Sequence, residues 1–145
     1  METTKIEAGK TVAEIQALLG SSQLVRATHA EYKDGKVVAL GFVILVNGSD
    51  LPFRLPARIE PVFRHLQRRR SPSHRLRAAD RDLEQAVRVA WRQILRWVQA
   101  QLALVECGMV DIAEVFLPYA LLPDMRTTLW QKLQADPSRL LEGSR

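Results

Sequence analysis

Residues 37–46, VVALGFVILV, form the longest apolar run in the chain and determine the fold that we expect. Asp34-Gly35 stands shortly before this run, and Asn47-Gly48 follows it directly. Both dipeptides are typical of two-residue hairpin turns, because aspartate, asparagine and glycine tolerate the positive φ that such turns require. The run therefore predicts a buried central strand with a neighbouring strand on each side. It is about half as long as a membrane-spanning helix, so we expect no association with a membrane.

The two flanking segments complete a three-stranded antiparallel meander. Residues 24–32 alternate loosely between apolar and polar side chains and predict the first strand. Residues 51–56 predict the third strand, in which apolar side chains again occupy every second position. Pro52 and Pro56 cannot donate a hydrogen bond to a neighbouring strand, so we place the third strand at an edge of the sheet.

Helical periodicity covers most of the remaining chain. Thr11 and Glu14 have the spacing of a capping box and predict a short first helix that ends at Gly20. The longest helix is expected from about residue 80 to Cys107, with Gly108 as its stop. Shorter helices are predicted at residues 58–66, 111–117 and 127–134.

The fold class that follows is α+β: a short N-terminal helix, a three-stranded antiparallel β-meander, and a C-terminal helical part with one long helix. A length of 145 residues fits a single domain. We divide it into the helix and meander (1–57), a mobile arginine-rich loop (67–79), the helical part (80–134) and a flexible tail (135–145). The long helix carries apolar side chains on more than one face, which is compatible with a homodimer.

The charge is distributed unevenly along the chain. The protein has 21 basic and 16 acidic residues, and residues 54–96 hold twelve arginines against four acids. This segment therefore carries a net charge of +8, whereas the rest, with nine basic and twelve acidic residues, carries −3. Such a concentration of one sign indicates an anionic partner, and the planar fork of arginine fits phosphate and carboxylate groups better than lysine does. An ordinary solvated helix face is the alternative.

The long helix concentrates part of this charge on one side. Arginines and glutamines recur at spacings of three and four residues from Arg81 to Gln99, and residues 68–77 add further arginines. Such a surface predicts phosphate contacts to nucleic acid without sequence preference, or docking on an acidic protein surface. The candidate binding residues are Arg64, Arg68, Arg69, Arg70, Arg75, Arg77, Arg81, Arg88, Arg92 and Arg96.

Motifs of catalysis are weak in this sequence, and we predict neither a catalytic residue, a metal site nor a cofactor. Gly9-Lys10-Thr11 resembles the end of a phosphate-binding loop, but Thr4 stands where that loop needs a glycine. Glu31-Tyr32-Lys33 has the spacing of metal-dependent nucleases but lacks a partner acid on the preceding segment, so a nuclease is the weakest alternative. The three histidines are far apart, and Cys107 has no histidine nearby in the sequence.

Three stretches of the sequence form a further pattern: residues 3–11 with Glu14-Ile15, residues 90–106, and residues 114–119. Together with the hairpin they resemble a family of small, uncharacterised tailed-bacteriophage proteins. The resemblance implies no known activity and no catalytic residues. It implies a phage origin, and with it a role in replication, recombination or host take-over.

Together these observations favour a non-enzymatic phage accessory protein that binds nucleic acid. The alternative is a phage-encoded inhibitor that binds a host or defence protein. The single cysteine excludes a disulfide framework, and the N-terminus lacks the apolar segment of a secretory signal. We therefore expect a cytoplasmic protein, located in the infected bacterium if the phage origin holds.

Overall fold

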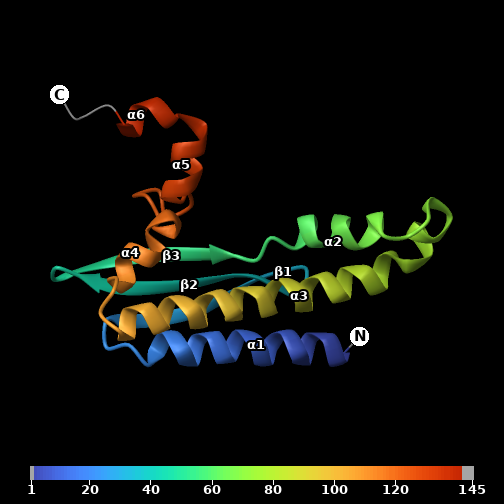
Figure 1. The fold of residues 1–145 in the computed structure, drawn as a ribbon, viewed down its shortest axis with the longest axis horizontal. Helices are drawn as coiled ribbons and strands as arrows, with labels where there is room; N and C mark the ends of the chain where they lie inside the picture. Colours follow the sequence, from blue (N-terminus) through green and yellow to red (C-terminus); the bar gives the residue numbers. More distant parts are fainter. Residues whose placement is uncertain (1, 142–145) are drawn as a thin grey trace.

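The computed structural model describes residues 2–141 and contains one sheet covered by helices (Figure 1). The α+β class and the predicted order of helix, meander and long helix are confirmed. The elements are α1 (Glu2–Gly20), β1 (Val25–Lys33), β2 (Lys36–Val46), β3 (Ser49–Pro56), α2 (Ile59–Arg68), α3 (Pro72–Glu106), α4 (Ile112–Phe116), the 3₁₀ turn η1 (Leu117–Tyr119), α5 (Leu129–Ala135) and α6 (Pro137–Leu141).

The sheet has the predicted order β1-β2-β3, with both neighbouring pairs antiparallel. Asp34 and Gly35 have φ values of 52° and 74°, and Asn47 and Gly48 have 49° and 82°, as two-residue hairpin turns require. The third strand lies at an edge, as its two prolines predict. A single bridge from Phe53 to Ala120 caps part of that edge.

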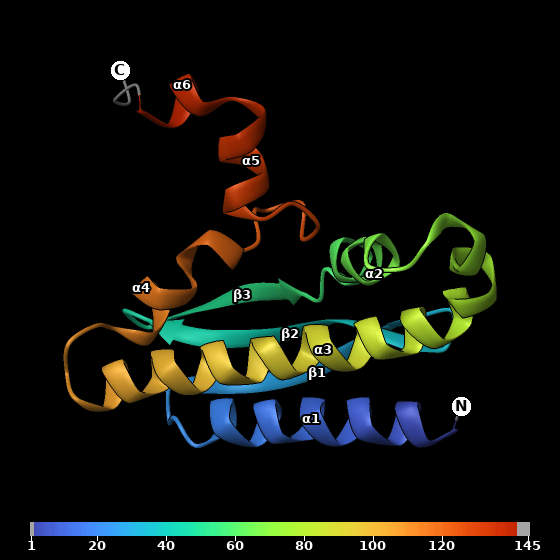
Figure 2. The same cartoon turned by 45° about the vertical axis from the view of Figure 1, so that its right-hand side comes forward.

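The core lies between the sheet and the two longest helices, α1 and α3, which run side by side in both views (Figures 1 and 2). Phe42 stacks on Phe53 of the neighbouring strand, with ring centroids 5.5 Å apart, and Phe116 meets Phe42 edge-on at 5.1 Å. Trp91 of α3 is fully buried, and its indole N–H donates to the Val37 carbonyl oxygen at 3.0 Å. This bond fixes the middle of α3 against the central strand.

The first helix is longer than the sequence predicts. It begins at Glu2, and the predicted capping box at Thr11 is wrong because Thr11 lies inside the helix. Its hydroxyl donates to the Glu7 carbonyl oxygen one turn earlier, at 3.0 Å. Tertiary contacts stabilise the part of α1 that precedes Thr11. Ala8 is buried in the core, and the Glu7 carboxylate pairs with Arg88 of α3.

The long helix begins at Pro72 rather than at residue 80, so the predicted loop over residues 67–79 is wrong except at the turn of residues 69–71. Pro72 suits the first turn of a helix, since that turn leaves its backbone N–H groups without helical partners. The predicted end is confirmed. Gly108, with φ of 77°, closes a Schellman motif in which its N–H donates to Val105 and that of Met109 donates to Leu104.

The C-terminal elements cover the second apolar face of α3. Trp97 contacts Phe116 and Tyr119 edge-on, with ring centroids 5.5 Å and 5.9 Å away. The homodimer was predicted because apolar side chains lie on more than one face of the long helix. Contacts within one chain account for part of that pattern. Residues 137–141 form α6, so the predicted flexible tail is wrong over this range, and residues 142–145 lie outside the described residues.

Within residues 2–141, no helix is both long and apolar enough to cross a membrane.

Candidate nucleic-acid interface

One side of α3 carries a row of exposed arginines. Arg81, Arg92 and Arg96 are all exposed, and Gln85 lies in the same row. Their spacings of four and seven residues place them on one side of the helix, and the row is about 22 Å long at 1.5 Å per residue. We call Arg81, Arg92 and Arg96 the α3 strip.

The sheet lies on the other side of α3, so the strip faces away from the core. Val87, Trp91 and Val98 are buried in the core, whereas the strip residues are exposed. Figure 2 shows α3 flanked by α1 and α2. No strip arginine forms an ion pair with a described acidic side chain. Their guanidinium groups are therefore available to an outside anion.

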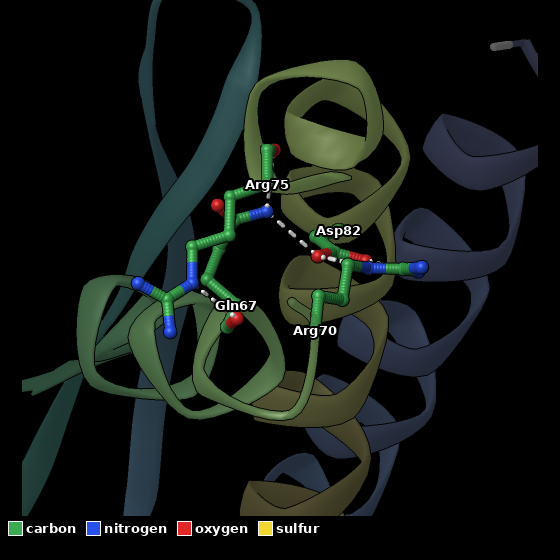
Figure 3. Close-up of polar contacts among 4 residues, drawn as sticks. All are labelled: Gln67, Arg70, Arg75 and Asp82. Carbon is green, nitrogen blue, oxygen red and sulfur yellow. Dashed lines mark hydrogen bonds and ion pairs between the residues drawn. The ribbon is translucent and has the colours of Figure 1, made fainter. Parts of the chain in front are cut away.

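The segment between α2 and α3 is a tight turn of residues 69–71 that is braced by a buried carboxylate (Figure 3). Asp82 is only 1% exposed, and both of its oxygens accept hydrogen bonds of 2.8 Å from the Arg70 guanidinium. The Gln67 amide donates to Asp82 at 2.8 Å and to the Arg75 carbonyl oxygen at 3.0 Å. The Arg75 Nε–H donates to the Gln67 carbonyl oxygen at 3.1 Å. We call Gln67, Arg70, Arg75 and Asp82 the hairpin brace.

The brace perturbs the titration of its charged members. Hydrogen bonds from Arg70 hold the pKa of the Asp82 carboxyl below its ordinary value, against the opposing effect of burial, and the Gln67 amide adds to the lowering. The same bonds raise the pKa of Arg70. Arg81 lowers the pKa of Asp82 further through its charge. Asp82 is therefore ionised at neutral pH and binds Arg70 in a bidentate pair.

The structure divides the ten predicted arginines into two groups. Four have partners within the chain: Arg70 and Arg75 in the brace, Arg88 with Glu7 at 3.2 Å, and Arg64 with Glu60 at 3.9 Å. The other six form no ion pair with a described acid: Arg68, Arg69, Arg77, Arg81, Arg92 and Arg96. The exposed cationic surface is therefore smaller than the sequence indicates. It combines the α3 strip with Arg68, Arg69 and Arg77 beside the α2–α3 turn, which we call the hairpin end.

The residues of the nuclease alternative lie on the outer face of the sheet, away from the strip. The Glu31 carboxylate accepts a bond of 2.8 Å from the Arg54 guanidinium across the central strand. The His29 ring lies over Gly41, so close that a Cβ at Gly41 would meet the ring at 2.1 Å. Among the described side chains, no group of three histidine, cysteine or acidic residues could hold a metal ion.

The turn before α5 lies next to the outer face of the sheet, where Met125 and Arg126 line one cavity with His29 and Arg54. The Asp124 side chain stabilises this turn. Its carboxylate accepts bonds from the backbone N–H groups of Arg126 and Thr127, both at 2.9 Å, and from the Thr127 hydroxyl at 2.6 Å. The Thr127 bonds lower the pKa of Asp124 to about 2. The ionised carboxylate thus stabilises the folded state above its unfolded pKa, and this contribution is lost as the pH falls toward 2.

Replacing Thr127 with valine is expected to raise the pKa of Asp124 from about 2 toward its ordinary value, because the strongest donor is removed. Titration of the carboxyl carbon by NMR measures this change. Ser138→Ala, which removes a hydroxyl donor from Asp136 instead, should leave Asp124 unchanged. A midpoint that stays near 2 in Thr127→Val would contradict the assigned cause.

No protein-family model, no curated protein and no solved structure matches this chain. The resemblance to tailed-bacteriophage proteins therefore stays a prediction, and a proposal of function depends on the geometry of the exposed arginines.

Sequence reasoning did not find the hairpin brace. Asp82 falls close to the predicted start of the long helix at residue 80, but in the structure it lies in the third turn of α3 and bonds Gln67 of α2. The bonded partners are 12 and 15 residues apart, which no helical spacing connects. A partial signal was present, since Ala78, Asp82 and Ala86 follow one another at intervals of four. Alanines one turn before and one turn after Asp82 indicate that another helix, here α2, packs closely against this side of α3.

Proposed function

We propose that this protein binds nucleic acid without sequence preference through the α3 strip and the neighbouring hairpin end. The observation that carries the proposal is that Arg81, Arg92 and Arg96 are exposed on one side of a continuous helix and form no ion pair with a described acid. Each guanidinium can bind a phosphate through two parallel hydrogen bonds. A duplex carries one phosphate per about 3.4 Å of axis on each strand, so a row of about 22 Å spans several of them.

The resemblance noted above supports a more specific role, as an accessory protein of phage replication or recombination in the bacterial cytoplasm. Contacts of this kind position the backbone of a nucleic acid and do not read its bases. The aromatic side chains of α3 do not favour base stacking, because Trp91 is buried and Trp97 packs on Phe116 and Tyr119. The proposed partner is therefore recognised by its phosphates.

The test is fluorescence anisotropy with labelled single- and double-stranded DNA and RNA across a salt series. We expect the logarithm of the affinity to fall steeply and linearly with the logarithm of salt concentration. Replacing Arg81, Arg92 and Arg96 together with glutamine should reduce that slope by about 3, since each lost phosphate contact releases about one counterion fewer. Affinity at low salt should fall by about tenfold or more.

The matched control removes the same charge elsewhere. Arg26, Lys33 and Arg126 are exposed on β1 and on the turn before α5, away from the strip. Their triple glutamine variant should keep most of the slope. Equal effects of the two triple variants would show that net charge, and not the strip, determines binding. Absence of binding by the unmodified protein at low salt would overturn the proposal and favour docking on an acidic protein surface.

A further inference from the structure

The outer face of the sheet, on the side away from α1 and α3, carries a cavity of about 600 Å³. Val43 of β2 and Pro52 of β3 lie opposite each other in the register and contribute apolar side chains to its floor. They point away from the core that Phe42 enters, because successive side chains of a strand alternate between the two faces. Leu121 and Met125, from the segment before α5, add an apolar wall. The volume and the mostly apolar lining are typical of sites for small molecules.

The wall of this cavity is fixed to the sheet. The Leu121 N–H donates to the Pro52 carbonyl oxygen at 2.9 Å, so the segment before α5 lies beside β3 (Figures 1 and 2). The Asp124 carboxylate closes the next turn through the three hydrogen bonds described above. Met125 has a φ of 60°, a left-handed conformation that a bulky side chain rarely adopts. Such a conformation persists only where the surrounding contacts impose it, and it recurs at ligand sites.

Four polar side chains complete the lining: His29, Glu31, Arg54 and Arg126. One Glu31 oxygen accepts from Nε and Nη2 of Arg54, both at 2.8 Å, which leaves the Nη1 group of Arg54 for another acceptor. Among the described residues, Arg126 has no ion pair. Asp124, two residues before Arg126, does not line the cavity, and its oxygens accept bonds from its own turn. The lining therefore holds two guanidinium groups against one carboxylate that is already paired.

The His29 ring adds a third donor to the cationic side of the cavity. His29 of β1 and Arg54 of β3 both pair with Gly41 of the central strand, one from each side. A Cβ at Gly41 would meet the His29 ring at 2.1 Å, so the glycine leaves the space that the ring occupies. The imidazole and the Arg54 guanidinium thus share one row across the sheet. Each can donate a hydrogen bond to an anion that lies above this row.

We propose that this cavity binds a small organic anion, with an apolar or aromatic body and one carboxylate or phosphate group. The body packs on Val43, Pro52 and the wall before α5, and the anionic group binds between Arg54 and Arg126. Charge complementarity favours an anion, because the only carboxylate in the lining already pairs with Arg54. The site lies across the sheet from α3, so the proposal does not depend on the α3 strip.

Fluorescence titration of the full chain with 8-anilinonaphthalene-1-sulfonate tests this proposal. The probe has an aromatic body and one sulfonate group, and N-phenyl-1-naphthylamine is the same molecule without the sulfonate. We expect the sulfonate probe to bind about tenfold more tightly or better, because only its anionic group accepts charge-assisted hydrogen bonds from the arginines. Equal affinities of the two probes, or no binding of either, overturn the proposal.

Competition distinguishes the two kinds of acid. 3-Phenylpropionate and phenyl phosphate have similar bodies, but one carries a carboxylate and the other a phosphate. Displacement of the sulfonate probe by either supports the proposal and identifies the preferred group. Failure of both to displace the probe overturns it.

A variant tests the role of Arg126. Arg126→Gln should weaken binding of the sulfonate probe by about tenfold, because it removes a charged donor from the cavity. The matched control is Arg139→Gln on α6, which removes the same charge from an exposed residue outside the lining and should bind the probe normally. Equal losses in the two variants would show that net charge alone attracts the probe, and would overturn the site.

Histidine NMR tests the location of the bound probe. The ring signals of His29 should shift as the sulfonate probe is added, whereas those of His74, near the start of α3, should stay unchanged. A shift of the His74 signals without a shift of those of His29 overturns the proposal. All these measurements omit nucleic acid, so their failure leaves the proposed function untouched.

Discussion

Replacing Trp91 with alanine is expected to lower the free energy of unfolding by about 4 kcal/mol, the largest effect of any single substitution that we consider. The indole is fully buried between α3 and the sheet, and its N–H bonds the Val37 carbonyl oxygen at 3.0 Å. Alanine removes the buried apolar surface and leaves a cavity that the surrounding elements fill only in part. It also removes the hydrogen bond that holds α3 on the central strand. Equilibrium denaturation in urea measures the change.

Two further variants separate these contributions. Trp91→Phe keeps most of the volume but removes the donor, so we expect a smaller loss of about 1–2 kcal/mol. Trp130→Ala is the control for loss of an indole as such, because Trp130 of α5 is 40% exposed, and it should cost less than about 1 kcal/mol. Similar losses for Trp91→Ala and Trp130→Ala would contradict the position of Trp91 in the core.

The second large effect is expected at Asp82. Its replacement by alanine leaves Arg70 and the Gln67 amide without their shared acceptor, and the turn between α2 and α3 loses the contact that fixes it. We expect the melting temperature to fall by about 5–10 °C, somewhat less than for a fully buried ion pair because Arg70 can turn toward water. Differential scanning calorimetry measures the fall. Asp80→Ala, an exposed neighbour without a described ion pair, is the control.

The pH dependence of stability provides an independent measure of the Asp82–Arg70 pair. Because the folded pKa of Asp82 is lowered, the unfolded state binds its proton more readily than the folded state does. The pair therefore contributes fully above the unfolded pKa of about 4, and the contribution is lost as the pH falls through the lower folded value. Asp82→Asn should flatten this part of the stability profile. A variant whose acid profile matches that of the unmodified protein would refute the assignment.

The meander was predictable because its signals are local. Asp34-Gly35 and Asn47-Gly48 each determine a turn from two adjacent residues, and Pro52 and Pro56 place β3 at the edge. The end of α3 was predictable for the same reason, because Gly108 alone marks it. The predicted starts of α1 and α3 were wrong because distant contacts determine them. α1 extends to Glu2 with the support of α3, and α3 extends back to Pro72 with the support of α2.

The candidate interface was predictable only as a charge pattern. The sequence shows ten arginines but not which of them have partners. Arg88 bonds Glu7, which is 81 residues away, and Arg70 bonds Asp82, which is 12 residues away and on another element. The spacing of Arg81, Arg92 and Arg96 on one helix face was visible in the sequence. The sequence does not show that these three guanidinium groups lack an ion pair with a described acid, because that depends on the folded structure.

The order of the elements along the chain has a consequence for the protein during its synthesis. α1 packs against α3, but the whole sheet and α2 separate the two helices in the sequence. A nascent chain that has reached the end of β3 already contains the stacked pair Phe42 and Phe53, yet Phe116, which packs edge-on against Phe42, has not been made. The growing chain therefore exposes this aromatic surface until residue 116 has been synthesised. Chaperone binding should concentrate on this interval, and a chain that stops after residue 57 should aggregate.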